Sequence, residues 1–203
     1  MPRTARIVYP GVPHHITQRG NRRQRVFFSD EDMALYLRLL SKWAEKAGLK
    51  IWAYCLMDNH VHHVAVPETG DSLAVAFGET HKAYTKIINE REDWGGFLWQ
   101  GRFTSFPMDM PYLYRAVRYD ELNPVRAKIV QDAIDYRWSS ARAHVLGEWN
   151  PLVTQSPLHM SGHEWADYLK EGMIDAEVEM FRNHTARATP LGDEGFLKRI
   201  GAL

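Results

Sequence analysis

Residues 51–67 read IWAYCLMDNHVHHVAVP, and this stretch decides the fold. Its two halves, 51–57 and 60–66, are rich in apolar and β-branched residues and are separated by an Asp-Asn pair. That pair is typical of a tight turn, and Pro67 ends the second run because proline donates no hydrogen bond to a sheet. The stretch therefore predicts a β-hairpin.

The segments around the hairpin alternate between strand and helix patterns. The hydrophobic periods and the turn residues predict a strand at 14–20, a helix at 29–47, a second helix at 72–91, a strand at 102–108 and a helix from 109 to 122. Ser29 is the expected N-cap of the first helix, and Gly48 its expected end. Asp109 and Pro111 have the features of a helix start, and Asn123-Pro124 those of a helix end.

The resulting order, β-α-β-β-α-β-α, predicts an α+β protein with a ferredoxin-like split βαβ fold. Right-handed crossovers place the first two helices together on one face of an antiparallel sheet. We expect this domain to cover residues 1–130 and a C-terminal extension to cover 131–203. The extension is expected to be mostly irregular, with one amphipathic segment near 164–179.

The composition is that of a globular protein without a membrane span or a secretory leader. Hydrophobic residues make up 45% of the chain, and a single cysteine, Cys55, is typical of the reducing cytoplasm. The formal net charge is zero, but residues 1–29 contain six arginines and no acid, whereas the acids outnumber the bases after Leu158. Such an asymmetry suits a polyanionic partner at the basic end or, equally, a solvated arm.

His60 and His62 share one face of the predicted strand, because successive side chains of a strand alternate. Two imidazoles at this spacing can bind a single cation, although most such pairs are surface or hydrogen-bonded histidines. Imidazole binds zinc, copper, nickel or iron in preference to magnesium, so the type of ligand alone does not identify the metal. His63 points to the other face and is expected to pack or to face solvent.

Tyr119 and Asn123 are four residues apart and therefore neighbours on one helix face. The amide oxygen of Asn123 is a candidate third ligand, and the phenol of Tyr119 is a candidate nucleophile. The spacing alone equally fits a core tyrosine and a helix-terminal asparagine.

Several motifs together resemble the REP-associated tyrosine transposases, relatives of the single-tyrosine HUH transposases of small insertion sequences. The resemblance rests on AYCLMDNHVHHVAVP (53–67), LWQGRF (98–103), RYDELNPVRAKIV (118–130) and YRWSSARAH (136–144). PGVPHHITQRGNRRQRVFF (10–28) and PLGDEGFLKRI (190–200) extend it over nearly the whole chain.

The resemblance implies an HUH nuclease domain in residues 1–130 that cleaves and transfers single-stranded DNA. It implies that His60, His62 and Asn123 hold a divalent cation, Mg²⁺ or Mn²⁺. It also implies that Tyr119 attacks a phosphodiester, which gives a 5′-phosphotyrosine and a free 3′-hydroxyl. The expected substrates are imperfect palindromes that fold into hairpins, and the expected assembly is a monomer or a homodimer.

The candidate DNA contacts are the arginines that follow the first strand and one in the WQGRF segment, namely Arg19, Arg22, Arg23, Arg25 and Arg102. Arginines bind phosphates, and an aromatic such as Trp99 stacks on an unpaired base or, equally, packs in the core. No P-loop motif is present, which fits a transesterification that needs no nucleotide cofactor.

Two positions depart from the resemblance, namely His63 and Asp120, where the family has apolar residues. We expect His63 to be a bystander and Asp120 to add negative charge near the phosphate. The alternatives are a cupin-type metalloenzyme, which the two helical patterns disfavour, and a DNA-binding regulator that keeps the fold but does not cut.

Overall fold

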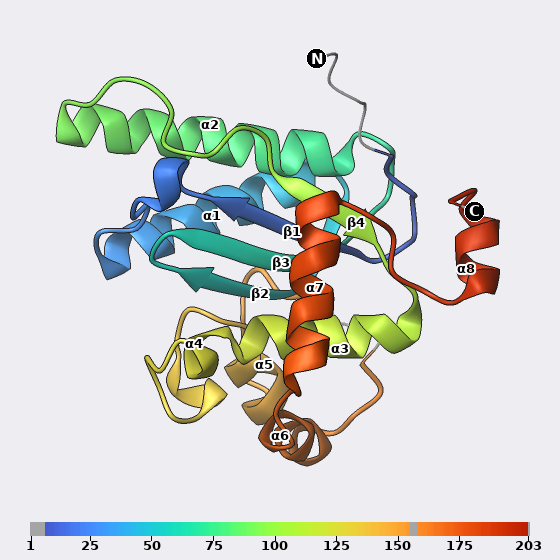
Figure 1. The fold of residues 1–203 in the computed structure, drawn as a ribbon. Helices are drawn as coiled ribbons and strands as arrows, with labels where there is room; N and C mark the ends of the chain where they lie inside the picture. Colours follow the sequence, from blue (N-terminus) through green and yellow to red (C-terminus); the bar gives the residue numbers. More distant parts are fainter. Residues whose placement is uncertain (1–6, 155–157, 203) are drawn as a thin grey trace.

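The computed structural model describes residues 7–154 and 158–202, and Figure 1 shows their arrangement. Arg3 and Arg6 of the basic N-terminal segment lie outside the described residues. The strands are β1 (His14–Arg19), β2 (Leu49–Met57), β3 (His60–Pro67) and β4 (Thr104–Pro107). The longer helices are α1 (Asp30–Lys46), α2 (Ser72–Glu92), α3 (Met110–Glu121), α6 (Gly162–Lys170) and α7 (Asp175–Arg187). Shorter helices are η1 (Asn21–Arg23), α4 (Asn123–Arg126), η2 (Ala133–Asp135), α5 (Ala141–Leu146) and α8 (Glu194–Arg199).

The predicted hairpin and the predicted α+β class are confirmed. The strands form one sheet in the order β2-β3-β1-β4, and all neighbours are antiparallel. This is the sheet of a split βαβ fold, in which each helix crosses from one strand to another two positions away. Strand β4 is shorter than predicted, because residues 102 and 103 precede the ladder.

The sheet separates two layers of helices and two apolar cores. Helices α1 and α2 lie side by side on one face, whereas α3 and α7 lie on the other (Figure 1). His63 is fully buried in the first core, with its ring 5.0 Å from that of Phe77, so the prediction that it packs away from His60 and His62 is confirmed.

The predicted helix caps are confirmed, because each depends only on neighbouring residues. The Ser29 hydroxyl accepts a hydrogen bond from the Asp32 amide, and Asp109 accepts one from the Tyr112 amide. Gly48 follows α1 with a φ of +59°, a left-handed conformation that a side chain would strain. Helix α3 ends before Asn123, as predicted, but the chain then forms one further helical turn, α4.

The prediction of a mostly irregular C-terminal extension is wrong. Residues 131–203 contribute α5, α6, α7 and α8, and they add to the sheet edges through bridges at Ser139 and Val153 beside β2. The fully buried Glu121 of α3 holds α5 and α6 in place, because its carboxylate accepts hydrogen bonds from Ser140, His144 and Trp165. Such tertiary partners leave no periodic signal in the sequence.

An ion pair between the buried Asp32 and the exposed Arg91 joins α1 to the end of α2, and its removal is expected to destabilise the fold. Both oxygens of Asp32 accept hydrogen bonds from Arg91, at 2.5 and 3.1 Å, and one also accepts from the Phe28 amide at 2.8 Å. Asp32→Ala leaves the Phe28 amide without its acceptor and removes one of the two carboxylates that bind Arg91, so we expect it to lower the free energy of unfolding by about 1–3 kcal/mol. Urea denaturation measures this loss. The matched control Lys170→Met breaks an exposed pair and should change stability by less than about 0.5 kcal/mol, and an equal effect of both variants would contradict the prediction.

Candidate functional site

His60 and His62 lie on the face of β3 that is turned toward α3, as the strand alternation predicted. Their ring centres are 5.1 Å apart. The turn residue Asn59 holds His60, because its Oδ1 lies 2.6 Å from His60 Nδ1 and accepts the ring hydrogen. The same amide donates to the carbonyl of Arg23, so Asn59 ties the hairpin turn to the basic segment after β1. The His60 Nε2 atom therefore carries the free lone pair of the ring.

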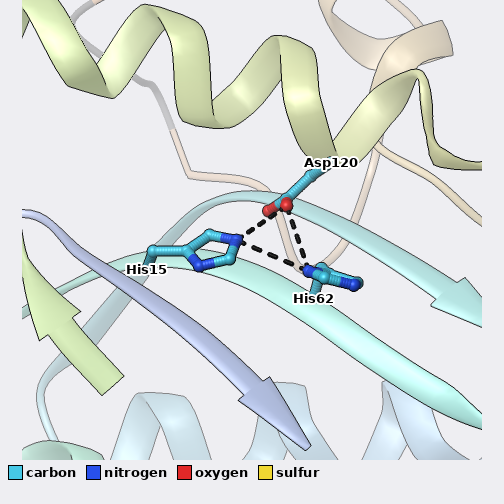
Figure 2. A group of neighbouring side chains, drawn as sticks. All are labelled: His15, His62 and Asp120. Atoms are coloured by element: carbon cyan, nitrogen blue, oxygen red, sulfur yellow. Dashed lines mark hydrogen bonds and ion pairs between the residues drawn. The ribbon is translucent and has the colours of Figure 1, made fainter. Parts of the chain in front are cut away.

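A buried carboxylate orients His62 in the same way (Figure 2). His15 of β1 and His62 of β3 both lie against Asp120 of α3, with His15 Nε2 at 2.8 Å and His62 Nδ1 at 3.4 Å from its Oδ1. His62 Nδ1 also lies 3.5 Å from His15 Nε2, but the ionised carboxylate can only accept, so each of these nitrogens donates to it and His62 Nε2 stays free to bind a cation. A carboxylate behind a histidine is the usual outer partner of a metal ligand, since it fixes the ring and raises its basicity.

The electrostatics of the site keep His60 and His62 neutral. Burial lowers the pKa of His60 to about 2, and the neighbouring His62 and Arg19 add to that shift. Burial also lowers the pKa of His62, against the opposing effect of Asp120. For Asp120, burial acts to raise the pKa, but His15 and His62 outweigh it and the pKa lies below its ordinary value. Near pH 7 the site therefore pairs neutral imidazoles with an ionised carboxylate.

Tyr119 and Asn123 reach the same site from α3 and the first turn of α4. Tyr119 faces His62, with ring centres 5.7 Å apart, and it is 6% exposed. Asn123 lines the pocket beside it, and its buried Nδ2 has no hydrogen-bond partner among the described residues. The tertiary structure thus brings together His60, His62, Tyr119 and Asn123.

Helix α7 and Arg126 complete the surroundings of Tyr119, and none of these residues was identified from the sequence. Phe181 stacks on the tyrosine ring at 4.9 Å, and the Arg126 guanidinium lies 4.3 Å from the ring centre. Burial raises the pKa of Tyr119, while Arg126 and a hydrogen bond from Arg182 act to lower it. The tyrosine is therefore a neutral phenol beside two cations.

The four residues line a pocket of about 840 Å³, whose rim is basic. Arg19, Arg23 and Arg102 of the predicted DNA contacts line it, and α7 adds Arg182. Among the described residues, no carboxylate forms part of its lining. Of the other predicted contacts, Arg22 is exposed outside the pocket and Arg25 pairs with Asp58 at 3.4 Å. The pocket has the charge and width to receive a phosphodiester.

The expectation that Asp120 adds negative charge near the phosphate stays a prediction, and its charge does reach the pocket, since it acts to raise the pKa values of Tyr119 and His60. Asp120 is fully buried and turned toward His15 and His62, away from the pocket lining. His15 was missed, although the antiparallel register places it on the same face as His62, since Thr17 pairs with His62 and His15 lies two residues before Thr17. The adjacent histidines of the first strand were the available signal.

The donor set fits a cation. Two imidazoles bound to one ion at about 2.1 Å have ring centres about 5 Å apart, which agrees with His60 and His62. A flip of the Asn123 amide would turn its carbonyl oxygen to where the unpaired Nδ2 now lies. His15, His62 and Asp120 are a second candidate group, with ligand atoms within 4.8 Å of one another. An ion bound by His15, His62 and Asp120 would displace the protons through which the two histidines contact Asp120. An ion bound by His60 and His62 leaves those contacts in place.

Asp120→Asn is expected to weaken Mn²⁺ binding by about 10- to 100-fold, because an outer carboxylate that orients a ligand typically contributes that much. Calorimetric titration of the folded variant measures the change. The control Asp58→Asn alters an exposed carboxylate of the neighbouring turn and should leave affinity unchanged. Loss of Mn²⁺ in His15→Ala but not in His60→Ala would instead place the ion in the buried group.

The comparisons with known proteins identify the family. A family model described as "Transposase IS200 like" matches residues 9–120. The chain belongs to this family. The IS200-like region thus runs from the residues before β1 to Asp120 and includes His15, His60, His62 and Tyr119. Among curated proteins, none matches the chain.

Two solved structures were compared with this IS200-like chain. One is described as the REP-associated tyrosine transposase bound to a REP hairpin; it is 20% identical, has a TM-score of 0.61, and the match covers 80% of this chain and 96% of that one. This similarity confirms the fold. The other, a transposase candidate from Deinococcus radiodurans R1, is 20% identical, with a TM-score of 0.41 and coverage of 64% and 94%. Over the described residues, no helix is long and apolar enough to cross a membrane.

Proposed function

We propose that the protein is a metal-dependent single-stranded DNA endonuclease and strand transferase that acts on palindromic hairpin repeats. The observation that carries the proposal is the single basic pocket lined by His60, His62, Tyr119 and Asn123. A pair of neutral imidazoles, an amide and a phenol in one arginine-rimmed pocket suit phosphodiester transfer. The proposal includes action in the cytoplasm as a monomer or a homodimer.

His60, His62 and Asn123 would hold the cation, which we propose to be Mg²⁺ or Mn²⁺. When bound, such an ion supplies Lewis-acid polarisation of a non-bridging phosphate oxygen. Asn59 and Asp120 keep the two imidazoles in place from behind. The arginines of the pocket, Arg19, Arg23 and Arg102, bind the flanking phosphates and hold the strand against the tyrosine.

Tyr119 is the proposed nucleophile. Its phenol oxygen bonds to phosphorus as the bond from phosphorus to the 3′-oxygen breaks, and the phenol proton ends on the freed 3′-oxygen. One phosphodiester is exchanged for another, so the reaction needs no nucleotide cofactor. Arg182, which hydrogen-bonds to the phenol, and Arg126, which lies over the ring, would stabilise the negative charge that develops on the phenol oxygen.

The proposed partner is single-stranded DNA that contains a hairpin. The protein of similar fold was solved with a REP hairpin, and the arginine-rimmed pocket of this chain fits the phosphates of such a strand. The test mixes purified protein with end-labelled single strands from palindromic repeats beside its gene, with Mg²⁺, Mn²⁺ or EDTA. We expect a denaturation-resistant protein–DNA adduct that requires the metal.

A DNA-binding regulator that does not cut is the second candidate. The observation in its favour is the cover over Tyr119, because the stacked Phe181 leaves the tyrosine only 6% exposed. Tight binding of hairpin strands without any adduct, in every metal tested, would establish the regulator and exclude the enzyme. Absence of single-strand binding would exclude both.

A further inference from the structure

A second hollow lies beside the pocket, between α2 and the loop at residues 96–103. We call it the α2 groove. It has a volume of about 680 Å³ and is adjacent to the pocket, since Gln18 and Arg102 line both. The proposed chemistry assigns no role to the rest of its lining.

The α2 wall of the groove is built for the close approach of a flat molecule. Ala74, Gly78, Lys82 and Lys86 recur every four residues and therefore share one face of the helix. The first two are small, and a Cβ added at Gly78 would meet nothing within 4 Å, so the space in front of this turn is open. The last two carry charge.

The floor and rim of the groove are aromatic. Trp99 and Phe103 are buried beneath it, and the ring of His81 lies 4.7 Å from that of Trp99. The Trp99 Nε1 is buried and donates to no acceptor among the described residues. At the rim, Phe97 is 85% exposed, so its ring face is open to a ligand in the groove. Such rings stack on nucleobases regardless of their sequence.

The charges along the groove are positive. Lys82 and Lys86 pair with Glu79 and Glu90 of the same helix at 3.7 Å, but all four side chains are exposed and their attraction is screened by water. The described lining contains no carboxylate and adds Arg102 at the junction with the pocket. Aromatic faces beside regularly spaced cations match the alternation of bases and phosphates in an unpaired strand.

We propose that the α2 groove binds an unpaired segment of the same DNA strand that enters the pocket, with a base on the exposed ring of Phe97 and phosphates on Lys82 and Lys86. The inference rests on the proposed function, since it assigns the segment that flanks the cleaved bond. Arg102 is the turning point between the two sites.

Fluorescence anisotropy with labelled strands tests the groove. One strand carries only the hairpin and the cleavable bond, and two others add six nucleotides at the 5′ or the 3′ end. We expect one extension to tighten binding by the wild-type protein. Phe97→Ala should cancel that gain, weakening the extended strand about tenfold, and Lys82→Gln with Lys86→Gln should reduce its salt slope by about 1.4. The short strand should bind all variants equally.

Gly78→Leu is the sharpest variant, because its side chain would occupy the groove from a position where a Cβ meets nothing within 4 Å, and it replaces a helix-weakening glycine. We expect a higher Tm, and we expect the extended strand to bind no more tightly than the short strand. Misfolding cannot produce this combination. Trp149→Ala, an equally exposed aromatic outside the groove, and Lys42→Gln with Lys46→Gln are the matched controls.

Two results overturn the inference: neither extension tightens binding, or the gain persists in Gly78→Leu and Phe97→Ala. The proposed function is judged separately, by the adduct that the wild-type protein forms with the short strand. If the extension tightens binding by the wild-type protein but not by the variants, and no adduct forms, the groove assignment stands and the nuclease proposal fails.

Discussion

Tyr119→Phe is expected to abolish the covalent protein–DNA adduct and to reduce strand cleavage by at least about 10⁴-fold, a loss typical of removing a covalent nucleophile. The variant removes only the hydroxyl, which we propose attacks phosphorus. The phenyl ring keeps its stacking on Phe181 and its place beside Arg126, so the fold and the pocket stay intact. Denaturing gel electrophoresis of end-labelled hairpin strands with Mg²⁺ or Mn²⁺ measures both quantities.

The matched control is Tyr112→Phe, which removes a hydroxyl from a half-buried tyrosine two turns earlier on the same helix. It should cleave like the wild-type protein. Binding of the uncleaved hairpin by Tyr119→Phe should stay within about twofold, because the arginines carry that affinity. An adduct that persists in Tyr119→Phe would show that another residue is the nucleophile and would refute this part of the proposal.

His60→Ala and His62→Ala are each expected to eliminate measurable Mn²⁺ binding and to lower cleavage by at least about 10³-fold, because each removes a ligand of the ion that polarises the phosphate. Isothermal titration with Mn²⁺ measures binding, and the labelled strands measure cleavage. Both side chains are neutral and half-buried or buried, so the folded state of each variant is checked by its Tm.

His163→Ala is the control for these substitutions, since its side chain is exposed on α6 and paired only with Asp167. It should bind Mn²⁺ and cleave as the wild-type protein does. The decisive contrary outcome is a His60→Ala protein that is folded and retains both Mn²⁺ binding and cleavage. That result would move the ion to the group formed by His15, His62 and Asp120.

The features predicted correctly are those that neighbouring residues determine. The hairpin at 51–67 follows from two β-branched runs and a turn, and the cap at Ser29 from a hydroxyl three residues before an amide. The shared face of His60 and His62 follows from strand alternation, and the transposase family from motifs spread along the chain.

The features that were missed depend on contacts between distant parts of the chain. Asp120 was predicted to add negative charge near Tyr119, but its contact with the histidines was missed, because adjacent helix residues point about 100° apart and Asp120 meets His15, 105 residues away. In the C-terminal extension the amphipathic segment near 164–179 was predicted and overlaps α6 and the start of α7. The contacts that hold these helices in place, with Glu121 and between Phe181 and Tyr119, have no local period and were missed.

The sequence by itself determined the strand and helix order, the histidine pair and the family, because these depend on spacing along the chain. Only the tertiary structure decided that Asp120 supports His62, that α7 covers Tyr119 and that the arginines at 19, 23, 102 and 182 share one pocket. The physical reason is burial: a side chain's protonation and reach depend on what packs against it, and that is set by the fold as a whole.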